Sequence, residues 1–424
     1  MVARYASIAA ALAAGATALL VPRDESSFGS TPGVLSLPVY QDIRLHPLEK
    51  LRRRAVSDTD VPVINVTSTT YLIELDIGTP GQDTKVALDT GSSELWVNPN
   101  CQKAGSTQQA QSCRANGQYD PDNSRTSVVY QNTGRIKYGK GEVALQYVAD
   151  NITLPGSDID LSQVIFGYAT DSVDLNRGIL GLSFGENKNN TGYPTVVEEM
   201  KAQNVIESLT MGIALGTKDE PTGSGLISFG GVDTKKFSGN LHSAPILGPQ
   251  NGESLWRYWV QLDSIALSKS GSSKTTYSNS QFPVFFDTGA TLSYFPSAVV
   301  PISEFIWEVS DNACVLGADK ASDGSYLLGD SFLRSAYVVF DQETPALHFA
   351  PYVNCGTNLQ KIPLGANAAA KFSGECSASN SSSGSGNSKN TAGRASVSSL
   401  WLLAGGRACL SFKHNVIQRL AFHA

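Results

Sequence analysis

Histidine is scarce in this chain, and so are charged side chains. Five histidines occur among 424 residues, and none lies in an H-E-x-x-H sequence or another spacing typical of metal ligands. Only 17% of the residues are charged, and the formal net charge of −6 leaves no basic surface for nucleic acid. We therefore expect no metal, no other cofactor and no nucleic-acid partner, and we expect a protein or peptide substrate.

The apolar run near the N-terminus is too short and too rich in alanine for a transmembrane helix. Residues 1–18 carry Arg4, a stretch of alanines with a leucine, and a small-residue ending, a pattern typical of a secretory signal peptide. Four Asn-x-Ser/Thr sequences agree with secretion, and they begin at Asn65, Asn151, Asn189 and Asn380. We expect a secreted glycoprotein that acts outside the cell.

A basic cluster, Arg52-Arg53-Arg54, separates the signal region from the first strand-like segment. Some secreted proteins are kept inactive until export by a segment that is later removed, and an exposed basic cluster is suited to such a cleavage. The sequence thus predicts a pro-segment over residues 19–54 and a mature protein that starts near Ala55.

Short strand-like runs dominate the chain from residue 69 onward, and helical signals are few. The clearest helical segment is residues 193–207, with Pro194 in its first turn. We predict an all-β protein with few short helices, formed by an N-terminal lobe and a C-terminal lobe (residues 55–238 and 239–365).

The residues that follow the second lobe, 366–424, begin with a tract of serine, glycine and asparagine that reads as a flexible linker and tail. A glycolipid-anchor signal would end in an uninterrupted apolar stretch. Charged residues interrupt the end of this chain, so anchoring to the cell wall or membrane is the weaker expectation.

Two segments of the chain share one design, an apolar run followed by Asp-Thr-Gly: "VALDTGSSELWV" contains Asp89, and "VFFDTGATLSYFP" contains Asp287. A second pair, "RGILGLSF" and "SYLLGDSF", follows them. Gly181 of this pair lies 92 positions after Asp89, whereas Gly329 lies 42 positions after Asp287. We infer an internal duplication whose second copy lacks about fifty residues after Val300, and an incorrect or alternative splice explains the loss.

If Asp89 and Asp287 meet between the lobes, the two carboxylates cannot both ionise cheaply, and the pair shares one proton. One member then acts as a general base on water, while the other, protonated, polarises the peptide carbonyl. Glycines permit close backbone approach around such a pair, and threonine hydroxyls can cross-link the loops: Gly91, Gly289, Thr90 and Thr288.

These loops, together with "YGKGE", "LWV" and "LLGDSFLRSAYVVFD", resemble the pepsin-type aspartic proteases, most closely the secreted fungal candidapepsins and yapsins. The resemblance spans residues 69–352 apart from the missing segment. It implies a bilobal β fold with a cleft for an extended peptide, and it implies catalytic roles for Asp89 and Asp287. It also implies a hairpin that covers the substrate, the flap, which carries Tyr138 and Gly139.

Within this family pattern, Trp96 is expected to hydrogen-bond the flap tyrosine. The two loops differ in one hydroxyl that can donate a hydrogen bond to the aspartate. Ser92 follows the first Asp-Thr-Gly, and Ala290 has the equivalent position after the second. Alanine has no hydroxyl to donate to Asp287. Lys140 puts a positive charge on the flap, where it either favours acidic side chains in the substrate or is simply solvated.

Six cysteines in a secreted chain indicate disulfides. Cys101 and Cys113 flank a polar loop and are a natural local pair. Cys355 and Cys376 can pair with each other or with Cys314, and the sixth cysteine lies in the tail.

Two other functional classes are open alternatives. "GLSFG" matches G-x-S-x-G, so Ser183 would be the nucleophile of an α/β serine hydrolase, with His242 or His348 as its base. A protease-like protein that binds peptides without cleaving them is the non-enzymatic alternative. We expect a monomeric aspartic endopeptidase with an acid pH optimum.

Overall fold

The computed structural model describes residues 32–44, 68–98, 101–103, 107–139, 141–155, 157, 159–173, 175, 177–216, 225–269, 274–278, 281–295, 306–310, 313–321, 325–377 and 418–423. Within these residues the fold is strand-rich, as predicted, and the α-helices are short: α1 Thr107–Asn116, α2 Val196–Ala202 and α3 Asp330–Leu333. No helix in these ranges is long and apolar enough to cross a membrane.

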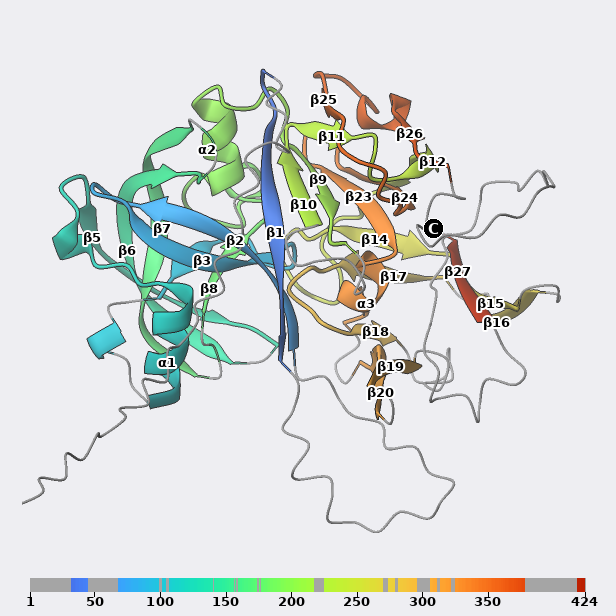
Figure 1. Cartoon of the computed structure of the whole chain (residues 1–424), viewed down its shortest axis with the longest axis horizontal. Helices are drawn as coiled ribbons and strands as arrows, with labels where there is room; N and C mark the ends of the chain where they lie inside the picture. Colours follow the sequence, from blue (N-terminus) through green and yellow to red (C-terminus); the bar gives the residue numbers. More distant parts are fainter. Residues whose placement is uncertain are drawn as a thin grey trace, which may run out of the picture.

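One large sheet joins the two halves of the molecule (Figure 1). Its thirteen strands lie in the order β13 (His242–Pro245), β24 (Ala346–Pro351), β23 (Ala336–Asp341), β9 (Thr210–Ala214), β10 (Gly225–Phe229), β1 (Leu35–Arg44), β2 (Ser68–Ile77), β3 (Gln82–Asp89), β8 (Gly178–Gly181), β4 (Leu95–Val97), β7 (Asp160–Val173), β6 (Glu142–Thr153) and β5 (Val128–Lys137). Buried apolar side chains from both halves form one continuous core around it.

A second sheet, of five strands, belongs to the C-terminal half, in the order β14 (Trp259–Leu262), β17 (Phe282–Phe286), β22 (Leu327–Leu328), β18 (Ser293–Phe295) and β21 (Ala318–Lys320). Smaller sheets pair β11 (Gly231–Asp233) with β25 (Leu359–Lys361), β12 (Ser238–Asn240) with β26 (Ser373–Glu375), and β19 (Ile306–Ser310) with β20 (Ala313–Leu316). In the last sheet, β15 (Ser264–Lys269) lies between β16 (Lys274–Ser278) and β27 (Gln418–His423).

The strand pairing shows the inferred duplication directly. In the first half, β3 is parallel to β8, which is antiparallel to β4, which is parallel to β7. In the second half, β17, β22, β18 and β21 repeat this arrangement with the same directions. The strand β7 has 14 residues, however, and its counterpart β21 has 3. The outer strand of the second arrangement is therefore much shorter than that of the first.

The helix α2 begins at Val196, two residues later than the position of Pro194 suggests. Thr195 caps it, because its hydroxyl accepts the N–H of Glu198 at 3.4 Å while the Glu198 carboxylate accepts the N–H of Thr195 at 2.7 Å. The apolar stripe predicted for this segment is buried, at Val196, Val197 and Met200.

The polar loop expected between Cys101 and Cys113 is in fact largely the helix α1. Its residues are polar and show no apolar stripe, so hydrophobic periodicity gave no helical signal. The expected disulfide joins Cys101 to Cys113 across it.

The strand β1 lies inside the predicted pro-segment, yet it is an interior strand of the large sheet. It pairs with β10 on one side and with β2 on the other. Leu35, Leu37 and Val39 are buried in the core. This segment therefore contributes to the contact between the two halves.

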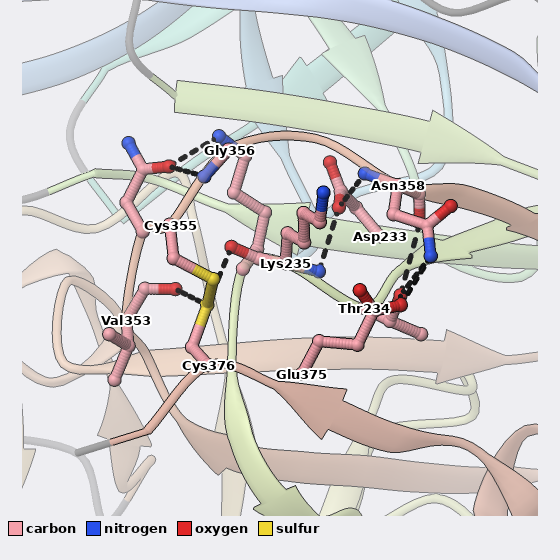
Figure 2. The surroundings of a disulfide bond; sticks show 11 residues. Asp233, Thr234, Lys235, Val353, Cys355, Gly356, Asn358, Glu375 and Cys376 are labelled. Atoms are coloured by element: carbon pink, nitrogen blue, oxygen red, sulfur yellow. Dashed lines mark hydrogen bonds between the residues drawn. A yellow bond between two sulfur atoms is a disulfide. The ribbon is translucent and has the colours of Figure 1, made fainter. Parts of the chain in front are cut away.

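The C-terminal half extends beyond residue 365, where composition predicts the start of the tail. The strand β26 pairs with β12, and a disulfide joins Cys355 to Cys376 (Figure 2). The Glu375 carboxylate accepts a hydrogen bond from the Thr234 hydroxyl at 2.6 Å. Main-chain strand pairing and a disulfide can hold small polar residues in place without apolar side chains. The composition of the sequence therefore places the end of the C-terminal lobe, at residue 365, too early.

Candidate active site

The two Asp-Thr-Gly loops meet at the centre of the molecule through their threonines. The hydroxyl of Thr288 accepts the N–H of Thr90 at 3.1 Å, and the hydroxyl of Thr90 accepts the N–H of Thr288 at 3.0 Å. Each hydroxyl also donates to the other loop's segment: that of Thr90 to the carbonyl oxygen of Phe286 at 2.9 Å, and that of Thr288 to the carbonyl oxygen of Leu88 at 3.0 Å. Both threonines are buried, so these four bonds fix one loop against the other.

The carboxyl groups of Asp89 and Asp287 each face the other loop. A Cβ atom added to Gly91 would lie 2.8 Å from Cγ of Asp287, and one added to Gly289 would lie 2.8 Å from Cγ of Asp89. Glycine is therefore required at both positions for the loops to approach this closely. Each aspartate also accepts the N–H of its own loop's glycine, at 2.9 Å for Asp89 and 2.8 Å for Asp287.

The supports of the two aspartates are unequal. The hydroxyl of Ser92 donates a short hydrogen bond to Oδ2 of Asp89, whereas Ala290 has no hydroxyl to offer Asp287. Burial, and then the charge of Asp89, raise the pKa of Asp287 well above its usual range. The N–H of Gly289 and the charge of Arg257 lower this pKa in part. Asp287 is thus the side chain for which the surroundings favour the protonated form.

The hairpin of β5 and β6 carries the predicted flap residues. The N–H of Tyr138 donates to the carbonyl of Gly141 at 3.0 Å, and the φ of +83° at Gly141 is one that glycine readily adopts. Apart from its two chain neighbours, no described residue has a heavy atom within 4 Å of the place where a Cβ on Gly139 would be. Lys140 lies outside the described residues.

Trp96 donates from Nε1 to the hydroxyl of Tyr138 at 2.8 Å, as expected. Trp96 is buried, so this bond connects the hairpin to a fixed part of the sheet. Burial, followed by the charge of Asp89, raises the pKa of Tyr138 well above its usual range.

Replacing Trp96 by phenylalanine keeps the aromatic ring and removes this donor. We expect kcat/KM to fall about fivefold, because a buried hydrogen bond contributes about 1 kcal/mol and its loss frees the flap tyrosine. Steady-state kinetics with one peptide substrate measures the effect. An unchanged kcat/KM in a folded Trp96→Phe variant would show that the bond does not position the flap.

One polar cluster beside this site was not found from the sequence. The Oε2 atom of Glu94 accepts hydrogen bonds from the hydroxyls of Tyr147 at 2.8 Å and Tyr193 at 2.5 Å. The only signal is an acidic residue directly after "DTGSS", and the two tyrosines are 53 and 99 positions away in the chain. The cluster connects the first loop to the flap strand and to the segment before α2.

The alternative nucleophile, Ser183, donates its described hydrogen bond to a main-chain carbonyl and not to a histidine. The hydroxyl of Ser183 donates to the carbonyl of Trp256 at 3.1 Å. His348 is buried, and its Nδ1 lies 2.8 Å from the hydroxyl of Ser243. The turn after β8 leads into a 3₁₀ turn (Glu186–Lys188), so the strand-to-helix elbow of a serine hydrolase is not formed at Ser183.

Two of the four glycosylation sequences lie within the described residues. Asn189 is exposed with φ +57°. Asn151 is half-buried in β6, where its Oδ1 accepts the N–H of Gln163 at 3.2 Å. Asn65 and Asn380 lie outside the described ranges. Of the two, Asn189 is the more accessible position.

Comparison with known proteins agrees with this geometry. A family model described as eukaryotic aspartyl protease matches residues 70–300 and 297–352. The chain belongs to this family. The two matches of this aspartyl protease meet at residues 297–300, where the sequence places the missing segment.

Several relatives of this aspartyl protease are fungal enzymes. It is 29% identical to the probable aspartic-type endopeptidase opsB of Aspergillus fumigatus, over 73% of this chain and 74% of that protein. Identity is 31% with rhizopuspepsin-1 of Rhizopus niveus, over 67% of this chain and 79% of that protein. It is 30% with secreted aspartic protease 8 of Candida albicans, over 66% and 75%. The protein is therefore an aspartic-type endopeptidase, an enzyme class that acts on peptides.

A third acid of this protease, Asp330, is buried at the start of α3. Its N–H donates to the carbonyl of Ala290 at 2.8 Å, while neither carboxyl oxygen has a hydrogen-bond partner in the described structure. Burial raises the pKa of Asp330 well above its usual range, against the opposing charge of Arg334, and the charge of Asp287 adds to the rise.

These raised pKa values predict that the protease loses stability as the pH rises. Asp287 and Asp330 ionise near pH 4 in the unfolded chain and at higher pH in the folded protein. Their contribution to the free energy of unfolding is therefore complete below about pH 4, and it is lost as the pH rises above that value. Thermal unfolding between about pH 3 and pH 7 should show a falling midpoint, and Asp330→Asn should reduce the slope. A midpoint that rises over this range would contradict the prediction.

Proposed function

We propose that this aspartic endopeptidase is secreted and that it hydrolyses peptide bonds by a water molecule activated between Asp89 and Asp287, with an acid pH optimum. The observation that carries the proposal is the buried threonine cross-link, which holds the two carboxyl groups against each other's loops. Two carboxyl groups held this closely favour a state with one shared proton.

The unequal supports suggest a role for each aspartate. Asp89, which accepts hydrogen bonds from Gly91 and Ser92, is the carboxylate that takes a proton from water. Asp287, whose pKa is raised, holds the proton that passes to the carbonyl oxygen of the substrate. The water oxygen bonds to the carbonyl carbon. The C–N bond then breaks as the leaving nitrogen takes the proton from Asp89, and one hydroxyl of the tetrahedral carbon returns its proton to Asp287 as the carboxylic acid forms.

The flap completes the site over the bound peptide. An extended peptide can form main-chain hydrogen bonds with a hairpin such as β5–β6, and the open space at Gly139 leaves room for its backbone. Tyr138, held by Trp96, would close over the bond to be cleaved. Exclusion of water strengthens every electrostatic interaction within the closed site.

Secretion and activation form a second part of the proposal. One relative bears the name secreted aspartic protease, and the sequence of residues 1–18 is typical of a signal peptide. We propose a monomeric zymogen that is cleaved near Arg54, with a glycan at Asn189. Since β1 is an interior strand, cleavage alone would leave it hydrogen-bonded to β10 and β2 until it is displaced.

The shortened second half supports an alternative, in which this chain is a mis-spliced form that binds peptides and cleaves them poorly. We expect the chain as given to bind a statine-type peptide, because the loops around the aspartates are complete. We expect its kcat/KM to be at least about tenfold below that of a chain with the segment after Val300 restored, because small displacements of reacting groups are costly.

Two measurements test this alternative. Sequencing the transcript shows whether a longer message exists, and acid hydrolysis of denatured haemoglobin by both chains compares their activity. Equal activity of the two chains, or a transcript that encodes only the short chain, would contradict the splicing hypothesis. Inhibition by a statine-type peptide but not by a serine-reactive phosphonate separates the aspartic mechanism from the use of Ser183.

A further inference from the structure

Arg257 crosses from the C-terminal half to the loop of Asp89. Its Nη1 donates a short hydrogen bond to the carbonyl of Gly91, 166 positions away in the chain. Its Nε donates to Oε2 of Glu253 at 2.6 Å, and its Cζ lies 5.5 Å from the centre of the Phe285 ring. Only 22% of the Arg257 side chain is exposed, and these three contacts fix its position.

The charge of this guanidinium bears on the second catalytic aspartate. The titratable groups that interact electrostatically with Asp287 include Asp89, Asp330, Tyr294 and Arg257. Among these, the two acids disfavour ionisation of Asp287, the tyrosine is neutral at acid pH, and Arg257 carries the positive charge. Arginine keeps its charge over the whole pH range in which the pair titrates.

Arg257 lies where it can replace a hydrogen bond that the second loop lacks. Ser92 supports Asp89 with a hydroxyl, and Ala290 gives Asp287 no such support. Gly91, whose carbonyl Arg257 binds, faces the carboxyl group of Asp287, so the charge of Arg257 favours the ionised form of Asp287 in place of a donated hydrogen bond. The same side chain holds the backbone of the loop that carries Asp89, so one residue acts on both members of the pair.

We propose that Arg257 is a positioning residue for the Asp89–Asp287 pair, which compensates for the hydroxyl that Ala290 lacks by its charge and by its bond to Gly91. The inference rests on the proposed function of the pair. A neutral donor would preserve the bond to Gly91 without the charge. Glu253, paired with Arg257, moderates that charge.

The proposal predicts opposite shifts of the pH profile of kcat/KM from two substitutions. Arg257→Gln removes a positive charge near the pair, so both the acid and the alkaline limb should move to higher pH. Glu253→Gln leaves the charge of Arg257 unmoderated, so both limbs should move to lower pH. Arg257→Lys keeps the charge and should keep the positions of the limbs while lowering kcat/KM.

A compensating substitution provides the matched control. Ala290→Ser in the Arg257→Gln background supplies the absent hydroxyl and should return the limbs toward their positions in the unsubstituted protein. Limbs that stay in place in Arg257→Gln, with only a lower kcat/KM, would overturn the proposal, since that is the result of a purely structural role. If Arg257→Gln does not fold, Glu253→Gln decides, and an unmoved or upward-shifted profile overturns the inference.

A different result would show that the proposed catalytic function is wrong. In that case the unsubstituted protein, with the segment after Val300 restored, would not hydrolyse peptides in a reaction that a statine-type peptide inhibits. Inhibitable hydrolysis with an unshifted Arg257→Gln profile refutes the role of Arg257 alone.

Discussion

Asp89→Asn and Asp287→Asn are each expected to lower kcat/KM for a peptide substrate by about 10³-fold or more, because each removes a group that moves a proton in the reaction. Asparagine has nearly the same shape as aspartate, so the loops should keep their structure. Hydrolysis of one quenched fluorescent peptide at acid pH measures the loss. Both variants should lose activity to a similar extent, since neither carboxyl group can do the work of both.

A matched control lies on the surface of the same sheet. Asp160 on β7 is exposed and accepts a hydrogen bond from the hydroxyl of Thr153 at 2.6 Å, so Asp160→Asn changes a charge of the same sign outside the two Asp-Thr-Gly loops. Its kcat/KM should remain within about twofold of the unsubstituted value. If Asp89→Asn or Asp287→Asn kept a tenth of the activity, the two-carboxylate mechanism would be wrong.

Thr288→Val should produce the largest loss of stability of any single substitution that keeps the shape of the site. Valine fills the same volume but leaves the N–H of Thr90 and the carbonyl of Leu88 without their partners in a buried place. Two such groups cost about 2 to 5 kcal/mol in the free energy of unfolding. Unfolding in urea measures the change, and kcat/KM should fall with it because the loops lose their register.

The control for this substitution is Thr288→Ser, which retains the hydroxyl and removes only a methyl group. It should cost less than half of the loss found for Thr288→Val. Equal losses in the two variants would mean that packing of the methyl group, and not the hydrogen-bonded cross-link, holds the loops together.

The central geometry of the site could be predicted because local sequence determines it. An apolar strand that ends in Asp-Thr-Gly specifies a tight loop with a carboxylate at its start, and two copies specify a pair. The short distance from Asp287 to Gly329 agrees with the difference between β21, of 3 residues, and its counterpart β7, of 14, and the loss of a segment after Val300 stays a prediction.

Other features depend on contacts between distant segments, which leave little trace in the sequence. The interior position of β1 depends on its pairing with β10, which is distant in the sequence. The basic cluster that follows β1 indicates only a pro-segment that can be cleaved. The bond from Arg257 to Gly91 spans 166 positions, and nothing near Arg257 distinguishes it from a solvated arginine. The polar helix α1 lacked an apolar face, so a disulfide loop was the natural expectation.

The measurement that tests proton sharing by Asp89 and Asp287 most directly is kcat/KM for one peptide between about pH 2 and pH 7. We predict a bell-shaped profile with its maximum at acid pH, because the reaction needs one proton on the pair and fails when the pair holds two or none. A profile that rises to a plateau at neutral pH, with the midpoint of a histidine, would contradict the two-carboxylate mechanism.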